Sequence, residues 1–421
     1  MKSNYKRLGD YIQELKVRNT EEKAEQLLGI NINKFFMPSV ANVVGTDLSV
    51  YKLVRKNQFA CNRMHVGRDY RLPVSMSKSD EEFMVSPAYD VFEIKDTKVL
   101  NPEFLMMWFT RSEFDRNAWF YTDADVRGGL PWKSFCDMIL PIPHPDKQKE
   151  IVKEYNVIQN RIALNQKMIQ KLEETAQAIY KQWFVEFEFP DENGKPYKSN
   201  GGEMVWNEEL QKEIPLGWEV GKLGDCINFY NGYGFESEEL LDTRIDDCYS
   251  VFKMGNIMKG GGLKIDGTKS WIEKNKCKGL EKFLLKKGDL LMCMTDMKDN
   301  IGLLGNTALM TINDEFIVNQ RVGLLRANNN MGISYRYLYL VTNSSTFLQD
   351  LRSRANRGVQ VNLTTNEIII TQMILADTQT NKSFDNILKA IFSKIDTTVG
   401  DIQLSEKMIK LLLSKLATIE N

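Results

Sequence analysis

The sequence predicts an α+β protein: two globular units of mixed helix and strand, separated by two long antiparallel coiled-coil helices and related by a pseudo-twofold internal repeat. Three observations predict this. The phrase IALNQKMIQKL at 162–172 is nearly repeated as IQLSEKMIKLL at 402–412. Both stretches carry apolar residues at alternating steps of four and three, the spacing of a supercoiled helix. The segments that precede them also resemble each other.

The two long helices share one predicted seam. Its members are Ile151, Ile158, Ile162, Asn165, Ile169 and Leu172 in the first helix, and Ile391, Ile395, Ile402, Ser405, Ile409 and Leu412 in the second. A shift of 240 residues superimposes the seams, including the polar positions Asn165 and Ser405, where a polar side chain can fix the register. Each helix is expected to run about 40 residues, or about 60 Å. Two copies of one module in one chain relate most simply by a twofold axis, which predicts antiparallel pairing.

The globular segments repeat more faintly. KRLGDYI at 6–12 resembles GKLGDCI at 221–227, and FLMMWFT at 104–110 resembles YLYLVTN at 337–343. Each of the latter precedes a glycine-bearing loop, VRGGLPW in the first half and NRGVQVNL in the second. The predicted division is a first globular unit at 1–143, a long helix at 144–188, a linker at 189–220, a second unit at 221–377 and a long helix at 378–421.

Shorter elements follow from local periodicity. Strands are expected, mostly antiparallel, at 89–94, 137–142, 249–253, 289–294, 316–325 and 367–375. Helices are expected at 20–28, 101–117 and 333–352.

Composition narrows the class of protein. The formal net charge is −1, so affinity for nucleic acid has to come from local patches. The start of the chain lacks the apolar region of a secretion signal, and no apolar run is long enough to span a bilayer. The six cysteines form no C-x-x-C pair, which favours reduced thiols over disulfides or a metal site. These features predict a cytoplasmic protein with no membrane contact.

The order of these elements resembles a known family. The phrase AQAIYKQWFVEFEF after the first long helix, the turn IPLGWEVGKLGD and the RGGLPW loop are similar to those of the DNA specificity subunits of type I restriction-modification systems. The resemblance implies that each globular unit is a target recognition domain reading one half of a split site in double-stranded DNA, with the long helices setting the spacing. It also implies that the chain is noncatalytic and holds no cofactor or metal. Its partners would be two methyltransferase subunits, which carry S-adenosylmethionine, and restriction/translocase subunits.

Local chemistry supplies candidate DNA contacts. Lys and Arg neutralise phosphates, whereas Arg, Asn and Gln can read base edges. The candidates in the first unit are Lys52, Arg55, Lys56, Arg63, Arg68, Arg71 and Arg127. Those in the second are Lys253, Lys259, Lys264, Arg352, Arg354, Arg357 and Gln360. Each charged residue has a simpler interpretation as part of a solvated surface.

Other interpretations remain open. The glycine stretch GNIMKGGGLKID at 255–266 is either a phosphate-approaching loop or a plain hairpin. The aromatic cluster of Tyr180, Trp183, Phe184, Phe187 and Phe189 either packs on the second unit or docks a methyltransferase. A coiled-coil scaffold that binds no DNA would share the long helices. A stand-alone metal-dependent nuclease could use Glu93 and Lys95, with Asp80 or Asp90 as the second carboxylate.

Overall fold

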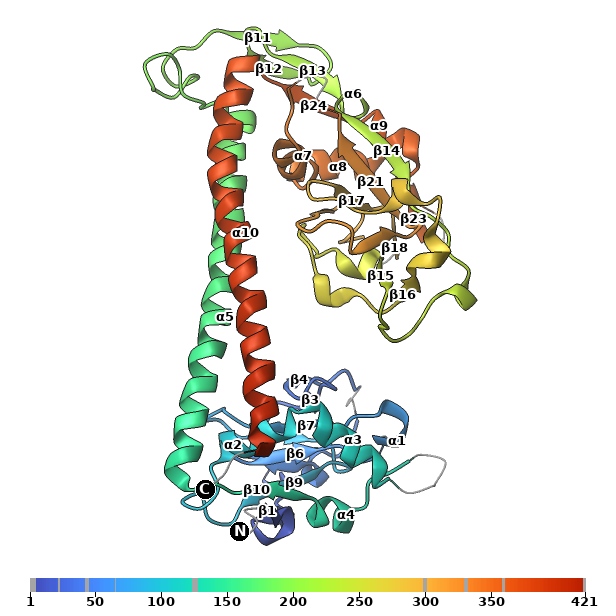
Figure 1. Ribbon diagram of the computed structural model, residues 1–421. Coiled ribbons are helices and arrows are strands. Elements are labelled where there is room, and N and C mark those ends of the chain that lie inside the picture. The colour runs from blue at the N-terminus through green and yellow to red at the C-terminus, as the bar shows by residue number, and fades with distance from the viewer. Residues whose placement is uncertain are drawn as a thin grey trace. The chain divides into compact units, whose positions relative to one another are not determined.

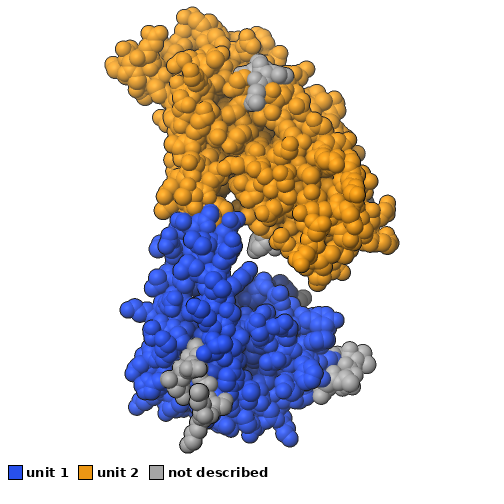
Figure 2. All heavy atoms as spheres, viewed as in Figure 1, with its two compact units in different colours: residues 1–166, 400–421 blue, residues 167–399 orange. Residues whose placement is uncertain are grey.

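The computed structural model defines most of the chain. It describes residues 5–21, 23–41, 45–64, 66–122, 128–297, 301–328, 332–357 and 360–418. The chain forms two compact units, one of residues 1–166 and 400–421 and the other of residues 167–399 (Figure 2). Among the described residues, no helix is long and apolar enough to cross a membrane.

The first unit is built on an antiparallel sheet and four short helices. The sheet order is β2 (Ile12–Leu15), β9 (Asp90–Ile94), β6 (Phe59–Cys61), β7 (Val74–Met76). Further strand pairs are β1 (Tyr5–Arg7) with β10 (Ile139–Pro141), β3 (Leu28–Ile30) with β4 (Phe36–Pro38), and β5 (Lys52–Val54) with β8 (Phe83–Val85). The helices are α1 (Val66–Asp69), α2 (Pro102–Phe109), α3 (Ser112–Phe120) and α4 (Trp132–Asp137) (Figure 1).

Aromatic rings fill the space between this sheet and its helices. Phe59 and Phe92 stack with their ring centroids 5.1 Å apart, and Phe109 meets Phe59 edge-on at 5.9 Å. All three side chains are fully buried, so they remove large apolar areas from water. Helix α2 begins where the sequence provides a cap, since Asn101 accepts hydrogen bonds from the backbone N–H groups of Glu103 and Phe104.

The second unit repeats the plan with more strands. Its main sheet is β14 (Ile227–Asn231), β21 (Val322–Ala327), β17 (Leu290–Cys293), β19 (Thr307–Leu309). The others are β16 (Trp271–Glu273), β15 (Cys248–Phe252), β20 (Phe316–Val318); β18 (Thr295–Met297), β23 (Gln360–Asn362), β22 (Asn356–Arg357); β13 (Glu219–Lys222) with β24 (Gln372–Leu375); and β11 (Met204–Asn207) with β12 (Lys212–Pro215). Its short helices are α6 (Leu223–Cys226), α7 (Tyr335–Thr342), α8 (Ser345–Ser353) and α9 (Thr365–Ile369). Except for β15 with β20, the strand pairs are antiparallel.

Two long helices, α5 (Pro145–Tyr180) and α10 (Thr378–Lys415), pack together as predicted (Figure 1). In the second unit, Met168 of α5 contacts Thr398 of α10, and Trp183, just after the end of α5, contacts Phe384 of α10. The later residue of the first segment thus meets the earlier residue of α10. The helices are therefore antiparallel. In the first unit, Ile158, Ile162 and Ile409 form a buried cluster.

The predicted seam is the inward face of these helices. Ile151, Ile158, Ile162, Ile395, Ser405 and Ile409 are buried, and Asn165, Ile169, Leu172, Ile391, Ile402 and Leu412 are partly buried. Neither polar seam residue makes a hydrogen bond across the pair. The Ser405 hydroxyl donates to the Asp401 carbonyl of its own helix, and the buried Asn165 Nδ2 has no partner. Asn165 thus costs stability, as a polar seam residue is expected to do.

The aromatic cluster that follows α5 packs inside the second unit. Phe184 lies 4.7 Å from the ring of Tyr337 and 4.8 Å from that of Phe384, and Phe189 stacks on Trp218 at 4.8 Å. All five predicted members, Tyr180, Trp183, Phe184, Phe187 and Phe189, are buried in this core. Of the two interpretations, core packing is confirmed, and the rings are not available to a partner.

Several predicted elements differ from the structure. The helix expected at 20–28 is wrong: Asn19 is buried and bonds both the N–H and the carbonyl of Ala24, residues 23–27 are not helical, and β3 begins at Leu28. The single helices expected at 101–117 and 333–352 are each two helices. The strand expected at 316–325 is two strands, and 367–375 combines the end of α9 with β24.

Candidate nucleic-acid interface

Three segments that are distant in sequence meet at one surface of the first unit. They are the stretch through α1 to Arg71, the C-terminal end of α3, and the glycine loop before α4. The Gly67 N–H donates to the Gly128 carbonyl at 2.7 Å, and the Leu130 N–H donates to the Arg63 carbonyl at 2.9 Å. The rings of Tyr70 and Trp119 lie 5.3 Å apart. The first-unit surface is defined here as residues 68–71, 119–121 and 128–130.

Two glycines allow this approach. Gly128 has φ +57°, a conformation that L side chains rarely adopt, and a Cβ added to Gly67 would lie 2.7 Å from the Gly128 Cα. The atoms in contact are backbone atoms, so no side-chain rotation relieves the clash. Gly128 of the RGGLPW loop is therefore explained by its close packing on α1.

A buried ion pair anchors α3 beneath this surface. The Lys34 ammonium lies 2.7 Å from Asp115 Oδ1, and their side chains are 5% and 12% exposed. The ammonium also donates to the Phe109 carbonyl, and the Leu72 N–H donates to the same Asp115 oxygen at 3.1 Å. Burial lowers the pKa of Lys34, and the Asp115 carboxylate opposes that shift. Each charge is hydrogen-bonded, as a buried pair requires.

The exposed part of the first-unit surface is aromatic and cationic. Tyr70, Trp119, Phe120 and Tyr121 are 62%, 45%, 78% and 49% exposed. Tyr70 also lines a cavity of about 360 Å³, together with Asn33, Arg71 and Arg116 among others. Arg71 donates to Asn33 at 3.2 Å, whereas Arg68 pairs with the neighbouring Asp69. Arg68 and Arg71, predicted as DNA contacts, are thus both at this surface and both solvent-exposed.

The same three segments meet in the second unit. The Leu363 N–H donates to the Met294 carbonyl at 2.9 Å, which corresponds to the Leu130–Arg63 bond of the first unit. Strand β18 follows β17 and pairs with β23 of the NRGVQVNL loop. Arg352 on α8 ties this helix to the β18–β19 connection, donating to the Leu304 carbonyl at 2.8 Å. The second-unit surface is defined here as residues 295–297, 356 and 360–362.

Amide and hydroxyl groups dominate this second surface. Strand register places Thr295 opposite Asn362 and Met297 opposite Gln360 on one face, while Val361 points into the core. Gln360, Asn362 and Met297 are exposed, and the Thr295 hydroxyl donates to Asn362 Oδ1 at 2.8 Å. Gln360, predicted as a base-reading residue, is therefore solvent-exposed and has a neighbouring amide.

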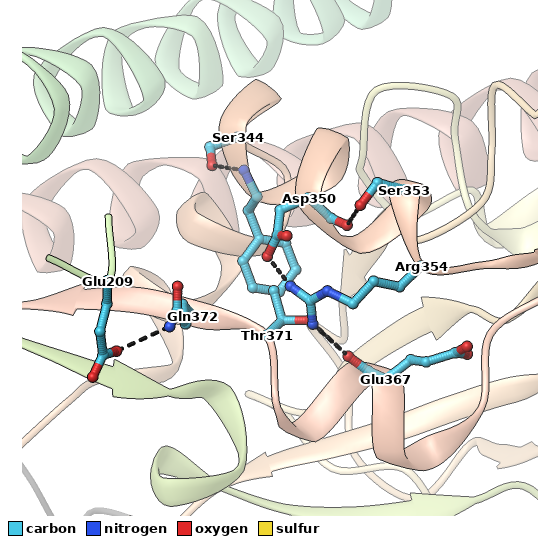
Figure 3. A network of polar contacts seen from close by, with 9 residues as sticks. Glu209, Ser344, Asp350, Ser353, Arg354, Glu367, Thr371 and Gln372 are labelled. Carbon is cyan, nitrogen blue, oxygen red and sulfur yellow. Dashed lines mark hydrogen bonds and ion pairs between the residues drawn. The ribbon is translucent and has the colours of Figure 1, made fainter. Parts of the chain in front are cut away.

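Two predicted base readers are held by internal contacts instead. The Arg352 guanidinium donates to carbonyls of Leu304 and Gly302 and to Asn306, and its pKa is lowered by burial. Figure 3 shows Arg354 between Asp350, Glu367 and Thr371, with Arg354 Nη1 3.3 Å from the Thr371 hydroxyl. Both arginines thus position α8 and α9. Arg357 lies on β22, but its side chain and all of Arg127 lie outside the described residues.

The remaining cations of the first unit are mostly paired. Lys52 donates to the Tyr89 carbonyl, Arg55 pairs with Glu82 at 2.9 Å, and Lys56 pairs with Asp80. Arg63 binds Asp90 at 2.6 Å and the Leu130 carbonyl, and its guanidinium lies 5.5 Å from the Trp132 ring centroid. Arg55 and Lys56 are exposed, and exposed pairs of this kind are weak. Lys52 and Arg63 instead hold strands and the glycine loop together.

In the second unit, the predicted lysines lie around the glycine stretch. Lys253 is partly buried and donates to the Ser270 hydroxyl at 2.8 Å, whereas Lys259 and Lys264 are exposed. The stretch itself is a tight hairpin: Ile257 bridges Leu263, and the Met258 N–H donates to the Gly262 carbonyl at 3.0 Å. Of the two interpretations, the plain hairpin accounts for its positive-φ glycines.

The carboxylates of the nuclease interpretation do not converge. Glu93 accepts from Gln13 at 2.7 Å and Gln58 at 3.1 Å, and Lys95 donates to two backbone carbonyls. Asp80 and Asp90 are paired with Lys56 and Arg63. Within the part of the chain that the structure describes, no group of three His, Cys, Asp or Glu side chains could hold a metal ion.

Sequence reasoning missed residues that the fold brings to these surfaces. Trp119, Phe120 and Arg116 were not selected in the first unit, nor was Asn362 in the second. One signal was available: Trp119–Phe120–Tyr121 continues beyond the buried positions Phe114 and Ala118 at the end of a helix. Consecutive aromatic residues there cannot all face one core.

Comparisons with known proteins agree with this architecture. Residues 215–404 match the family model of the type I restriction modification DNA specificity domain. The MjaIX specificity subunit of a type I restriction enzyme from Methanocaldococcus jannaschii is 32% identical over 121 residues, 28% of this chain and 26% of that protein. The MjaVIII specificity subunit from the same organism is 24% identical over 290 residues, 68% of this chain and 63% of that protein. The chain thus spans about a quarter of the first relative and less than two thirds of the second.

A solved structure is also similar. The S subunit of a type I restriction-modification system from M. genitalium superimposes with a TM-score of 0.47 and 14% identity, covering 99% of this chain and 96% of that one. Together, the matched specificity domain, the named relatives and the repeated plan of unit and long helix confirm the resemblance recognised in the sequence. Residues 215–404 of the chain therefore carry the DNA specificity domain of type I restriction-modification systems.

Proposed function

We propose that this chain is the noncatalytic, sequence-specific DNA-binding subunit of a type I restriction-modification complex, with each globular unit reading one half of a bipartite site. One observation carries the proposal. The same three segments meet in each unit, yet the exposed side chains of the two surfaces defined above are aromatic and cationic in the first unit and amide-rich in the second. Two units that bind different half-sites need the same backbone scaffold but different side-chain contacts to DNA.

The chemistry of the second-unit surface suits base edges. Side-chain amides pair a donor with an acceptor, and adenine presents the complementary pair in the major groove. Gln360 and Asn362 lie two residues apart on one strand, so their side chains leave the same face of the sheet. The exposed Lys259 and Lys264 of the glycine hairpin in the same unit suit phosphates, which supply affinity without sequence information.

The proposed partners follow from the family. Double-stranded DNA and two methyltransferase subunits would bind this chain, and S-adenosylmethionine would be held by those subunits. Restriction/translocase subunits would complete the complex in the cytoplasm. The support is that the matched relatives are named as specificity subunits of type I restriction enzymes.

We further propose that α5 and α10 set the length of the unread gap between half-sites. Their seams repeat the same pattern, so the pair has a fixed register. One heptad inserted in each helix adds about 10.5 Å, which corresponds to about three base pairs. The selected gap should lengthen by that amount, and a gap that stays constant would refute the spacing role.

The test of function is selection of duplexes from a randomised pool by the full chain assembled with its modification subunits. A motif of two specified parts around an unspecified gap is expected, with affinity that falls steeply with salt. The variant Gln360→Ala/Asn362→Ala should relax one part and keep the other. Asn275→Ala, which removes an exposed amide elsewhere in the second unit, is the matched control.

Two other outcomes decide against the proposal. A scaffold that binds no DNA would select no motif and would be unaffected by either substitution. A stand-alone nuclease would cleave DNA when the isolated chain is incubated with magnesium. The arginine cluster is a poor target for this test, because Arg352 and Arg354 hold α8 and α9 and their loss would disturb the fold.

A further inference from the structure

Four exposed aromatic side chains gather on the first unit at the end of α3. Tyr70, Trp119, Phe120 and Tyr121 all lie in the first-unit surface, and their rings contact in pairs: Tyr70 with Trp119 at 5.3 Å, and Phe120 with Tyr121 at 5.4 Å. Contiguous exposed aromatic side chains are uncommon on a soluble protein and mark interaction sites.

The cluster is held rigidly. Tyr70 has φ +54°, which is unfavourable for a bulky residue and is fixed by the structure around it. Beneath it, the Lys34–Asp115 pair joins α3 to the chain before β4, and Asp115 also accepts from the Leu72 backbone. Rings presented by such a scaffold lose little freedom when they bind.

Cationic groups line the 360 Å³ cavity, to which the cluster contributes Tyr70. Arg71 and Arg116 both line it, together with Asn33. Arg116 is exposed and lies 3.6 Å from Glu113, too long and too solvated to hold it firmly. A guanidinium group can bind phosphate oxygens through two parallel N–H donors. Aromatic rings beside such groups suit a ligand with flat apolar faces and a phosphate backbone.

Comparison with the second unit favours DNA, rather than a protein, as the partner of this cluster. Trp119 and Arg352 are each the eighth residue of their helices, α3 and α8, so the two units carry different chemistry at corresponding places. A surface that docked the same partner in both units would be expected to carry similar residues in both. Surfaces that bind different DNA half-sites would be expected to carry different residues.

Resting on the function proposed above, we propose that this aromatic cluster is the specificity-determining contact of the first unit: Trp119 and Phe120 pack against base pairs of the duplex, while Arg71 and Arg116 bind a backbone phosphate. Apolar side chains act in this way where they contact thymine methyl groups or wedge into a base step. The first half-site is then read by shape and apolar contact, whereas the second is read by amide hydrogen bonds.

The test compares Trp119→Ala and Phe120→Ala with wild type in the full chain assembled with its modification subunits. Duplexes are again selected from a randomised pool, and affinity for the wild-type motif is measured. Each variant should weaken binding about tenfold or more, which is the factor that corresponds to 1.4 kcal/mol. Sequence preference should be lost in one half of the motif and kept in the other. Arg116→Ala should weaken all sequences alike and reduce the salt slope by about one.

Controls separate the possible causes. Trp206→Ala removes a tryptophan that is 56% exposed on β11 of the second unit and should change neither half of the motif. Trp119→Phe should retain most of the specificity, and equal melting temperatures show that the variants are folded. If both halves persist at unchanged affinity, or if the variants lose their modification subunits while keeping the motif, the inference is wrong. A wild-type complex that selects no bipartite motif would instead overturn the proposed function and this inference with it.

Discussion

The buried ion pair of the first unit offers a quantitative test of how the candidate surface is supported. Lys34→Met removes an ammonium whose side chain is 5% exposed and leaves the Asp115 carboxylate buried. That carboxylate keeps only one described N–H donor, from Leu72. Breaking a buried pair by removing one partner costs about 3–5 kcal/mol, because the remaining charge is uncompensated.

This cost converts into a melting temperature. The unit contains about 190 residues, and for that size each kcal/mol shifts the midpoint by about 2–4 °C. Thermal unfolding followed by circular dichroism should therefore show that the melting temperature of the first unit falls by about 6–20 °C. The double variant Lys34→Met/Asp115→Leu should recover most of this loss, since apolar side chains of similar size can replace a buried pair.

A double-mutant cycle gives the decisive comparison. Strong coupling is expected between Lys34 and Asp115, because they touch and share partners. If Lys34→Met costs less than about 1 kcal/mol, or if the two single substitutions add without coupling, the pair does not anchor α3 as argued.

Three further substitutions test other parts of the structure. Asn165→Leu removes a buried amide nitrogen that has no partner and should raise the free energy of unfolding by about 1–3 kcal/mol in urea titrations; a loss of stability would show that the amide is satisfied in solution. Burial on α5 raises the pKa of Glu173 to about 6, so its protonated form is favoured by folding, and the stability this contributes is present below pH 4.5 and lost as pH rises through 6. Glu173→Gln should therefore stabilise the protein at pH 7.5 by up to about 2 kcal/mol and have little effect at pH 4, whereas an equal effect at both would contradict the raised pKa. Gly67→Ala places a Cβ 2.7 Å from the Gly128 Cα and should lower stability by about 1–3 kcal/mol, and an unchanged melting curve would mean that the glycine loop is not packed on α1.

The pairing of the two long helices was predictable because it depends on the local periodicity of apolar residues. A heptad pattern fixes which side chains face a partner helix, so Ile158, Ile395 and Ile409 could be placed in the seam from spacing alone. The cluster from Tyr180 to Phe189 was similarly predictable, since five rings that close together need a core.

The candidate surfaces were less predictable because their geometry depends on distant partners. Arg352 and Arg354 looked like base readers, but the carbonyls that bind Arg352 lie some 50 residues earlier in the chain. Arg63 is likewise bound by Asp90 and Leu130, which strand pairing brings to it. Conversely, periodicity marks which residues face the core and does not say whether an aromatic side chain such as Phe120 meets another segment or solvent.

The segment expected as a helix at 20–28 shows the same limit on a smaller scale. Its apolar periodicity favours a helix, yet a single buried side chain, Asn19, offers the backbone of Ala24 two alternative hydrogen bonds. Tertiary burial of that amide decides the outcome, and burial is not visible in a window of ten residues.

The most direct test of the account is the pattern of DNA methylation in cells that carry this chain and its cognate modification subunits. Sequencing that detects modified bases across the genome should show methylation confined to one motif with two specified parts and an unspecified gap of fixed length. Substituting Gln360 and Asn362 should alter one part, and substituting Trp119 and Phe120 the other. A single continuous motif, or one whose two parts both change with either pair, would contradict the claim that each unit reads its own half of the site.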